Sequence, residues 1–119
     1  MASQALFLLV VDDELAVLRT IELILQRAGY SVSTAATADD ASRLLKSIHF
    51  GLVLLDCLPD YARLIEEAKG LNPNVRIVVC TGNPTVSDLP LADIVLHKPI
   101  PPPVLLTEIA NLLFVSKAA

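Results

Sequence analysis

Short apolar runs recur along this chain, and each one ends at a polar residue or a turn signal. They cover residues 6–11, 52–55, 75–80 and 94–96 and are rich in Val, Leu and Ile. Runs of this length and composition indicate buried β-strands. Residues 30–35 alternate between apolar and polar positions, as an edge strand does when one side faces water. The hydrophobic pattern therefore predicts five strands.

Between the first two strands, apolar residues recur at helical spacing, and Gly29 follows where a left-handed helix cap is favoured. The predicted buried stripe consists of Leu15, Leu18, Ile21, Leu25 and Ala28. A second helix is predicted to begin at Thr37, whose hydroxyl can cap the helix while Asp40 reaches back. Its buried stripe consists of Ala41, Leu44, Leu45 and Ile48.

Two more helices follow later in the chain. One is predicted over residues 60–70, with Leu64, Ile65 and Ala68 facing inward. The last begins in the proline run 101–103, because proline fits the first helical turn. Its apolar positions are Leu105, Ile109, Leu112 and Leu113. Within residues 81–93, two prolines leave room for only one or two turns, so this helix, fourth in the alternating order, is predicted to be short or absent.

Strands that alternate with helices predict an α/β fold, in which right-handed crossovers build a doubly wound, five-stranded parallel sheet. A chain of 119 residues has the size of one domain, so residues 1–119 are expected to form a single domain. Functional sites in such sheets lie at the carboxyl ends of the strands. The polar side chains predicted at those ends are Asp12, Asp13, Asp56, Thr81 and Lys98.

Composition narrows the function classes. The net charge is −4, aromatic residues make up 4% and Trp is absent, so neither a basic footprint nor a stacking surface for nucleic acid is expected. The apolar segment 5–11 is too short to span a bilayer and has no cleavage site after it. Cys57 and Cys80 are expected to be reduced, small buried hydrophobes in a cytoplasmic protein.

Three carboxylates are predicted to gather at one edge of the sheet: Asp12 and Asp13 after the first strand and Asp56 after the third. Each unshielded pair would cost about 1 to 4 kcal/mol near 4 Å. A bound cation removes that cost. Because no Cys or His accompanies the carboxylates, Mg²⁺ or Mn²⁺ is predicted rather than zinc. Lys98 would add a second positive charge.

Each of these residues also has a purely structural interpretation. Asp12 or Asp13 can cap the helix that follows, where acids are favoured. Lys98 can lie on the surface, and Thr81 can cap a turn. Asp56 is harder to explain in this way, because an acid that follows a wholly apolar strand needs a partner. The shared position at one edge of the sheet favours a functional site.

Four motifs resemble those of response-regulator receiver domains, and the resemblance extends over essentially the whole chain. They are Val10-Val11-Asp12-Asp13-Glu14, Leu54-Leu55-Asp56, Thr81-Gly82 and Lys98-Pro99. The resemblance implies a flavodoxin-like fold with strand order 2-1-3-4-5 and a cis peptide bond before Pro99.

The resemblance also implies roles for individual residues. Asp13 and Asp56 would bind Mg²⁺ together with the Leu58 carbonyl, and Asp12 would act through water. Asp56 would accept a phosphoryl group from a histidine kinase or a phosphotransfer protein. Thr81 and Lys98 would then contact that group.

The loop after Asp56 departs from the family pattern. It reads Cys57-Leu58-Pro59-Asp60-Tyr61, lacks the usual glycine and is shortened. Because proline pushes the preceding residue toward extended geometry, the Leu58 carbonyl can be misdirected. Metal binding is the property that this departure affects most directly.

The span from residue 81 to residue 98 is also shorter than in most of the family. Val95 stands where the family often has a switching Tyr or Phe, so coupling of Thr81 to an aromatic side chain cannot operate. Weak or absent phosphorylation-driven dimerisation is therefore expected, with the chain a monomer or weak dimer. His97 flanks the site, with its side chain directed away from that of Lys98.

The predicted function is a phospho-accepting signalling module that catalyses, at most, its own phosphorylation and dephosphorylation. Its kinase and its output partner are not identified by the sequence. The rival prediction is a pseudo-receiver, a protein-interaction module that keeps the fold but works without phosphorylation. A phospho-aspartate hydrolase ranks last, because no cap segment is present and no second acid beyond Asp12 and Asp13 is suited to acid–base work.

Overall fold

Strands and helices alternate in the computed structural model, which describes residues 7–57, 59–86 and 89–114. The strands are β1 (Phe7–Val11), β2 (Ser31–Ala35), β3 (Leu52–Asp56), β4 (Arg76–Thr81) and β5 (Ile94–His97). The helices are α1 (Leu15–Arg27), α2 (Ala38–Ser47), α3 (Tyr61–Leu71) and α4 (Pro102–Phe114). Each predicted strand and helix is thus present, with bounds shifted by a residue or two.

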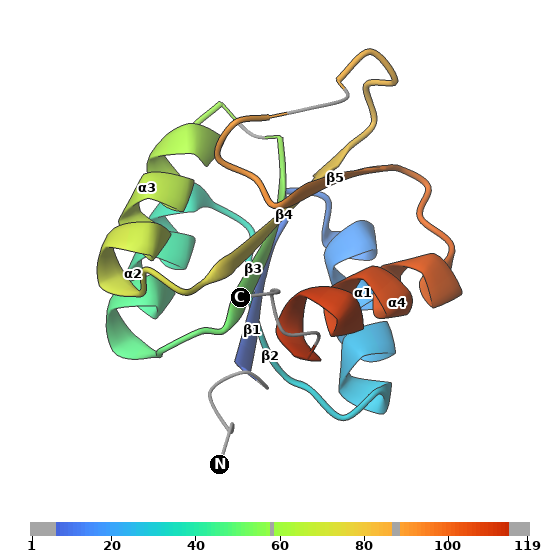
Figure 1. Ribbon diagram of the computed structural model, residues 1–119, viewed down its shortest axis with the longest axis horizontal. Helices are drawn as coiled ribbons and strands as arrows, with labels where there is room; N and C mark the ends of the chain where they lie inside the picture. Colours follow the sequence, from blue (N-terminus) through green and yellow to red (C-terminus); the bar gives the residue numbers. More distant parts are fainter. Residues whose placement is uncertain (1–6, 58, 87–88, 115–119) are drawn as a thin grey trace.

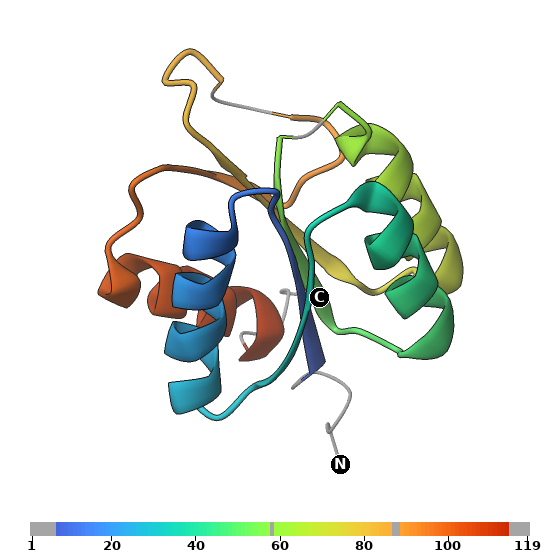
Figure 2. The same cartoon turned by 180° about the vertical axis from the view of Figure 1, so that it is seen from behind.

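All five strands are parallel and lie in the order β2-β1-β3-β4-β5. Helices α2 and α3 cover one face of the sheet, and α1 and α4 cover the other (Figure 1). Figure 2 shows the same two layers from behind. The predicted doubly wound, flavodoxin-like fold with order 2-1-3-4-5 is confirmed, and β2 lies at an edge as its alternating pattern indicated.

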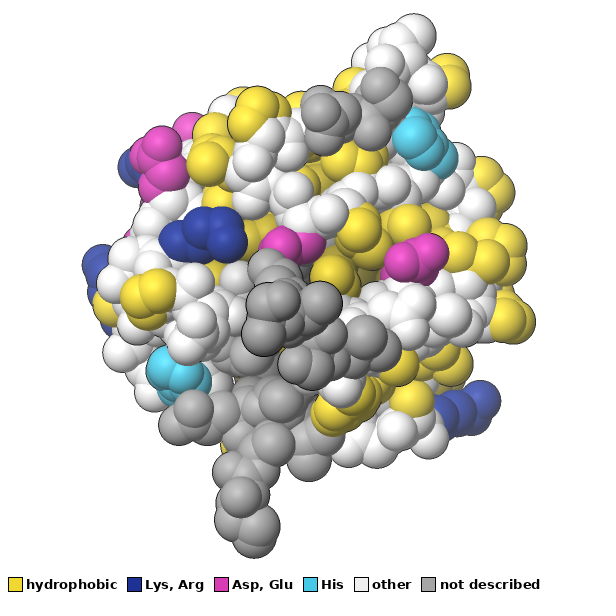
Figure 3. Space-filling model, in the orientation of Figure 1, with side chains coloured by type: hydrophobic (Ala, Val, Ile, Leu, Met, Phe, Trp, Pro, Cys, Tyr) yellow, Lys and Arg dark blue, Asp and Glu magenta, His cyan; other side chains and the backbone are white. Residues whose placement is uncertain are grey.

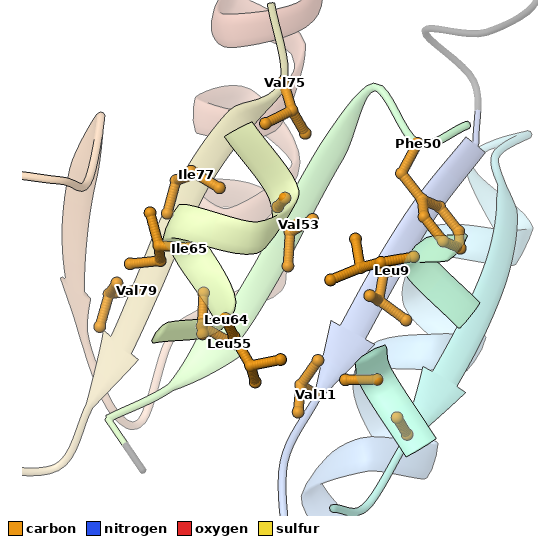
Figure 4. Packing of buried hydrophobic residues seen from close by; sticks show 14 residues of the cluster. Leu9, Val11, Phe50, Val53, Leu55, Leu64, Ile65, Val75, Ile77 and Val79 are labelled. Carbon is orange, nitrogen blue, oxygen red and sulfur yellow. The ribbon is translucent and has the colours of Figure 1, made fainter. Parts of the chain in front are cut away.

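Two hydrophobic clusters fill the space on either side of the sheet. Alternate residues of β1, β3 and β4 enter one cluster under α2 and α3, which Figure 4 shows at close range. The intervening residues enter a second cluster under α1 and α4. Because both faces are covered, the central strands carry no polar alternation and read as continuous apolar runs.

Two of the predicted helix ends are observed. Gly29 follows α1 with a φ of 102°, a backbone conformation that glycine adopts without a steric penalty. The Thr37 hydroxyl oxygen accepts a hydrogen bond from the Asp40 amide at 3.1 Å, as the cap prediction required. The prediction that the Asp40 carboxylate reaches back is wrong, because that carboxylate pairs with Arg43 one turn along.

The predicted stripe of α1 is only partly buried. Leu18, Ile21 and Leu25 lie in the core, but the Leu15 side chain is 62% exposed. Ala28 is also exposed and is the C-cap residue of the helix. The reason is local: Leu15 begins α1 beyond the carboxyl edge of the sheet, so the first turn has no strand beneath it. Helical spacing identified the face of the helix and not the extent of the sheet.

The connection between β4 and β5 contains no helix in its described residues, 82–86 and 89–93. This confirms the prediction of a short or absent helix between Pro84 and Pro90. Leu89 and Ala92 pack against the cluster under α2 and α3. No helix in the described part of the chain is both long and apolar enough to cross a membrane.

The surface around the start of α4 is apolar. On the face shown in Figure 3, hydrophobic side chains gather over this region and charged side chains are few. Pro102, Pro103 and Val104 are exposed there.

Candidate functional site

The carboxyl ends of the strands bring the predicted site residues together. Asp12 follows β1, Asp56 ends β3 and Lys98 follows β5. By strand alternation these three positions share the face covered by α1 and α4, since Val10, Leu54 and Leu96 two residues earlier all belong to that cluster. The three side chains therefore meet above the same edge of the sheet.

Lys98 bridges two of the carboxylates. Its Nζ lies 2.8 Å from Oδ2 of Asp12 and 3.2 Å from Oδ1 of Asp56. Burial alone would lower the pKa of Lys98, but the hydrogen bonds and charges of Asp12 and Asp56 outweigh burial and raise it. Lys98 thus holds a fixed positive charge beside the Asp56 carboxylate and is not a solvated surface lysine.

Asp12 is almost fully buried, with 2% of its surface exposed. Its Oδ1 accepts a hydrogen bond from the Glu14 amide at 2.9 Å, while its Oδ2 accepts from Lys98. The N-cap residue of α1 is Glu14, which makes no side-chain cap bond. The interpretation of Asp12 or Asp13 as the N-cap is therefore wrong, although Asp12 does fix the backbone just before the helix.

Asp13 completes a group of three carboxylates. One oxygen each from Asp12, Asp13 and Asp56 lie within 4.8 Å of one another. Oxygens on opposite sides of an octahedral Mg²⁺ are roughly 4 Å apart, so the donor set suits a small hard cation. Asp13 is exposed and pairs with no cation in the described part of the chain, while both Asp12 oxygens are already engaged.

The Asp56 carboxylate is held by the backbone amide of the next residue. Its Oδ1 accepts a hydrogen bond from the Cys57 amide at 2.9 Å. Cys57 itself is exposed, so the expectation that it is a buried hydrophobe is wrong; Cys80 is buried as expected. The difference arises because Cys57 lies beyond the last residue of β3. Leu58, the predicted carbonyl ligand, lies outside the described residues.

Thr81 ends β4 and is 3% exposed. Its Oγ1 accepts a hydrogen bond from the Asn83 amide at 3.0 Å, so the interpretation as a turn cap is also realised. That bond uses a lone pair and leaves the hydroxyl proton free to be donated. A side chain added at Gly82 would meet no atom within 4 Å, so the space beside Thr81 is open.

Three residues near the site have contacts or properties that the sequence did not predict. Cys80 pairs in register with Asp56, and burial raises the pKa of its thiol to about 12. Asn83 organises the turn after Thr81, for which the Thr-Gly-Asn sequence was an available signal. The His97 ring contacts the Val86 carbonyl, a pairing that no local sequence signal reveals.

A doubly wound parallel sheet with a lysine and three carboxylates at its carboxyl edge is the arrangement of receiver-type signalling domains. The response regulator receiver domain family matches residues 8–110 of this chain. The chain belongs to that family, and thus to the proteins of two-component signalling. The cis peptide bond between Lys98 and Pro99, implied by the resemblance, is present.

Curated relatives are much longer than this chain. The alginate biosynthesis transcriptional regulatory protein AlgB of Pseudomonas aeruginosa is 35% identical over 82 residues, which cover 66% of this chain and 18% of that protein. AlgB of Pseudomonas syringae pv. tomato is 38% identical over 88 residues, with the same shares covered. The chain thus spans less than a fifth of the length of these relatives.

Solved receiver domains superpose closely. A CheY-like receiver domain from Methanospirillum hungatei is 33% identical, with a TM-score of 0.79 and coverage of 90% of this chain and 92% of that one. A receiver protein from Sinorhizobium medicae is 29% identical, with a TM-score of 0.81 and coverage of 94% and 97%. TrrA of Thermotoga maritima, solved in complex with Mg²⁺ and BeF, is 27% identical, with a TM-score of 0.79 and coverage of 90% and 98%.

Proposed function

We propose that this receiver domain accepts a phosphoryl group on Asp56, with the help of Mg²⁺ or Mn²⁺, from a histidine kinase or a phosphotransfer protein. The observation that carries the proposal is the position of the Lys98 ammonium, which contacts Asp12 and Asp56 at once. Phosphoryl transfer needs an attacking carboxylate beside fixed positive charge, because negative charge develops on the equatorial oxygens in the transition state.

The two oxygens of Asp56 have different surroundings. Oδ1 accepts from the Cys57 amide and contacts Lys98, whereas no described residue donates to Oδ2. Oδ2 is therefore the oxygen suited to attack phosphorus in line. The new P–O bond forms as the P–N bond to the donor imidazole breaks, and the electron pair of that bond returns to the imidazole nitrogen.

The carboxylates supply the ligands for the metal. Asp13 and Asp56 would bind the cation directly together with the Leu58 carbonyl, while Asp12, with both oxygens engaged, would act through water. When bound, the divalent cation supplies positive charge to the phosphoryl oxygens and relieves the repulsion among the carboxylates.

Lys98 and Thr81 would hold the phosphoryl group once it is attached. The Lys98 ammonium already lies beside Asp56 and can pair with a phosphoryl oxygen without a large movement. The Thr81 hydroxyl has a free proton to donate, and the open space at Gly82 leaves room on that side.

The proposal also includes the extent of the domain, its location and its partners. Residues 1–119 would form one receiver domain in the cytoplasm, acting with a histidine kinase or a phosphotransfer protein and with an output partner still to be identified. The support is the match of the family over residues 8–110 and the similarity to part of AlgB.

The direct test is phosphorylation by a small donor. The native chain, incubated with acetyl phosphate and Mg²⁺, is expected to gain one phosphoryl group by intact mass and to shift in a phosphate-affinity gel. Asp56→Asn should show neither change, whereas Asp60→Asn, which alters a nearby exposed carboxylate, should behave like the native chain. A native chain that takes up no phosphoryl group would contradict the proposal and favour the pseudo-receiver.

A further inference from the structure

A continuous path of hydrogen bonds leads from the end of β4 to the end of β5. The Asn83 amide donates to the Thr81 hydroxyl oxygen at 3.0 Å, and the Val86 amide donates to the Asn83 carbonyl at 3.2 Å. The Val86 carbonyl in turn contacts Nε2 of His97. The loop of residues 82–86 is therefore tied at one end to a predicted phosphoryl contact and at the other to an imidazole ring.

The backbone at both ends of this path is held by the sheet. Thr81 and His97 are partners in the β4–β5 register, and the Lys98 amide donates to the Thr81 carbonyl at 2.8 Å. Register partners in parallel strands direct their side chains to the same face. Because the sheet holds the backbone of Thr81 and His97, a movement of Val86 relative to β5 changes the contact between the Val86 carbonyl and the His97 ring.

The Asn83 side chain holds residues 83–85 together, so that they are expected to move as one rigid segment. Its Oδ1 accepts from both the amide and the hydroxyl of Thr85, at 3.0 and 2.7 Å. These bonds close an Asx turn that begins at Asn83, the residue whose amide contacts Thr81. A displacement of the Asn83 amide is thus carried along the turn toward Val86.

We propose that this loop couples the phosphorylation state of Asp56 to His97, with Asn83 as the positioning residue of the coupling. The inference rests on the proposed function, because Thr81 must bind the phosphoryl group for the loop to move. Val95 offers no aromatic side chain for the usual coupling in the family, so the loop supplies a different route from Thr81 to the surface of β5.

The direction of the change follows from the donors and acceptors. When the Thr81 hydroxyl donates to a phosphoryl oxygen, its oxygen still accepts from the Asn83 amide and draws the loop toward the site. The Val86 carbonyl can only accept, so Nε2 of His97 carries a proton in the present contact. Movement of that carbonyl changes the hydrogen bond on Nε2 at an exposed residue that a partner can reach.

Histidine ring NMR tests the coupling directly. The chain has two histidines, and His49 is an exposed residue between α2 and β3, at the opposite end of the sheet. Beryllofluoride with Mg²⁺ stands in for the phosphoryl group, and the Cys57 amide, bonded to Asp56, reports its binding. The ring nitrogens of His97 are expected to shift with the same titration curve as the Cys57 amide, while those of His49 stay unchanged.

Two variants at residue 83 isolate the loop. Asn83→Ala removes the acceptor of the Asx turn, so the Cys57 amide should still respond while the His97 shift is lost. Asn83→Asp keeps an acceptor oxygen and should restore the shift. A responding Cys57 amide with an unmoved His97 in the native chain overturns the coupling, as does a full His97 response in Asn83→Ala.

The native chain also separates this inference from the proposed function. A Cys57 amide that does not respond to beryllofluoride and Mg²⁺ would overturn the proposed function, and the coupling with it. The native readings decide the coupling even if Asn83→Ala fails to fold.

Discussion

The ammonium of Lys98 lies 2.8 Å from Oδ2 of Asp12, a carboxylate that is 2% exposed. A buried charge is tolerated only when it is paired and hydrogen-bonded, and here one lysine meets both needs. The residue proposed to stabilise the phosphoryl group is thus also the residue that makes a buried acid compatible with folding. Function and stability are expected to change together when it is altered.

Replacing Lys98 is expected to destabilise the chain. Lys98→Met keeps the length of the side chain but leaves the Asp12 carboxylate without its cation, which should cost roughly 3 kcal/mol in the free energy of unfolding. Urea denaturation measures the change. Mg²⁺ should recover part of the loss, because the cation replaces some of the missing positive charge.

The control for this prediction is an ion pair whose lysine is exposed. Lys46 lies 3.9 Å from Glu67 with most of its side chain in solvent, so Lys46→Met should cost less than about 1 kcal/mol. Similar losses in the two variants would show that Asp12 is not dependent on Lys98.

Removing Asp13 should have opposite effects on stability and on metal binding. Without metal, Asp13→Asn relieves repulsion with Asp12 and Asp56 and should stabilise the chain by about 1 kcal/mol. The same change removes a ligand, so the affinity for Mg²⁺ should fall roughly tenfold or more. Thermal unfolding and calorimetric titration with Mg²⁺ measure the two effects. Glu66→Gln, at an exposed position on α3, should change neither the stability nor the affinity for Mg²⁺. If Asp13→Asn leaves that affinity unaltered, Asp13 is not a ligand.

The sequence predicted that Asp12, Asp56 and Lys98 lie together, because strands that alternate with helices form a parallel sheet and each of these residues follows or ends a strand. The order of the strands, which decides how near these residues come to one another, was implied only by the resemblance to the family. The short or absent helix after β4 was predicted correctly from Pro84 and Pro90, whereas the cis bond before Pro99 was implied only by the resemblance to the family. Proline interrupts a helix by local sterics, whereas the local residues do not select the cis form, which is the minority form of an X-Pro bond.

Errors arose where the outcome depends on how far an element extends. Leu15 has the spacing of a core residue but lies beyond the sheet, and Cys57 follows an apolar strand but is exposed. The Asp40 carboxylate had two possible partners, the backbone amide of the N-cap residue Thr37 and the side chain of Arg43. The spacing of apolar residues does not show which of the two it binds. The contact of His97 with Val86 depends on the path of a loop, which the sequence does not determine.

Alkaline pH should destabilise the chain through Cys80. Burial raises the pKa of this thiol from 9.0 to about 12, so the folded state keeps a proton that the unfolded state loses. Its contribution to stability is full below pH 9 and is lost as the pH rises from 9 to about 12, at up to about 1.4 kcal/mol per pH unit. The raised pKa of Lys98 acts in the same direction above 10.5.

Comparing two cysteine variants isolates that effect. Cys80→Ala should lose stability at neutral pH by a cavity cost that does not depend on pH, and its decline above pH 9 should be shallower than in the native chain. Cys57→Ala, at an exposed position, should follow the native curve. Urea unfolding at several pH values provides the measurement, and parallel curves for all three proteins would refute the role of Cys80.

Phosphorylation-driven dimerisation is expected to be weak or absent. The described residues between β4 and β5 form no helix, so a symmetric interface on this side has only the short β5 and the apolar start of α4 to use (Figure 3). A stable interface buries about 800 Å² on each partner. The narrow apolar strip formed by β5 and the start of α4 is not expected to supply that area. Sedimentation of the chain with beryllofluoride and Mg²⁺ should therefore show a monomer, with Val104→Asp, which charges the strip, as the matched variant. A clean shift to a dimer that Val104→Asp abolishes would contradict this prediction and would assign the apolar strip as the interface.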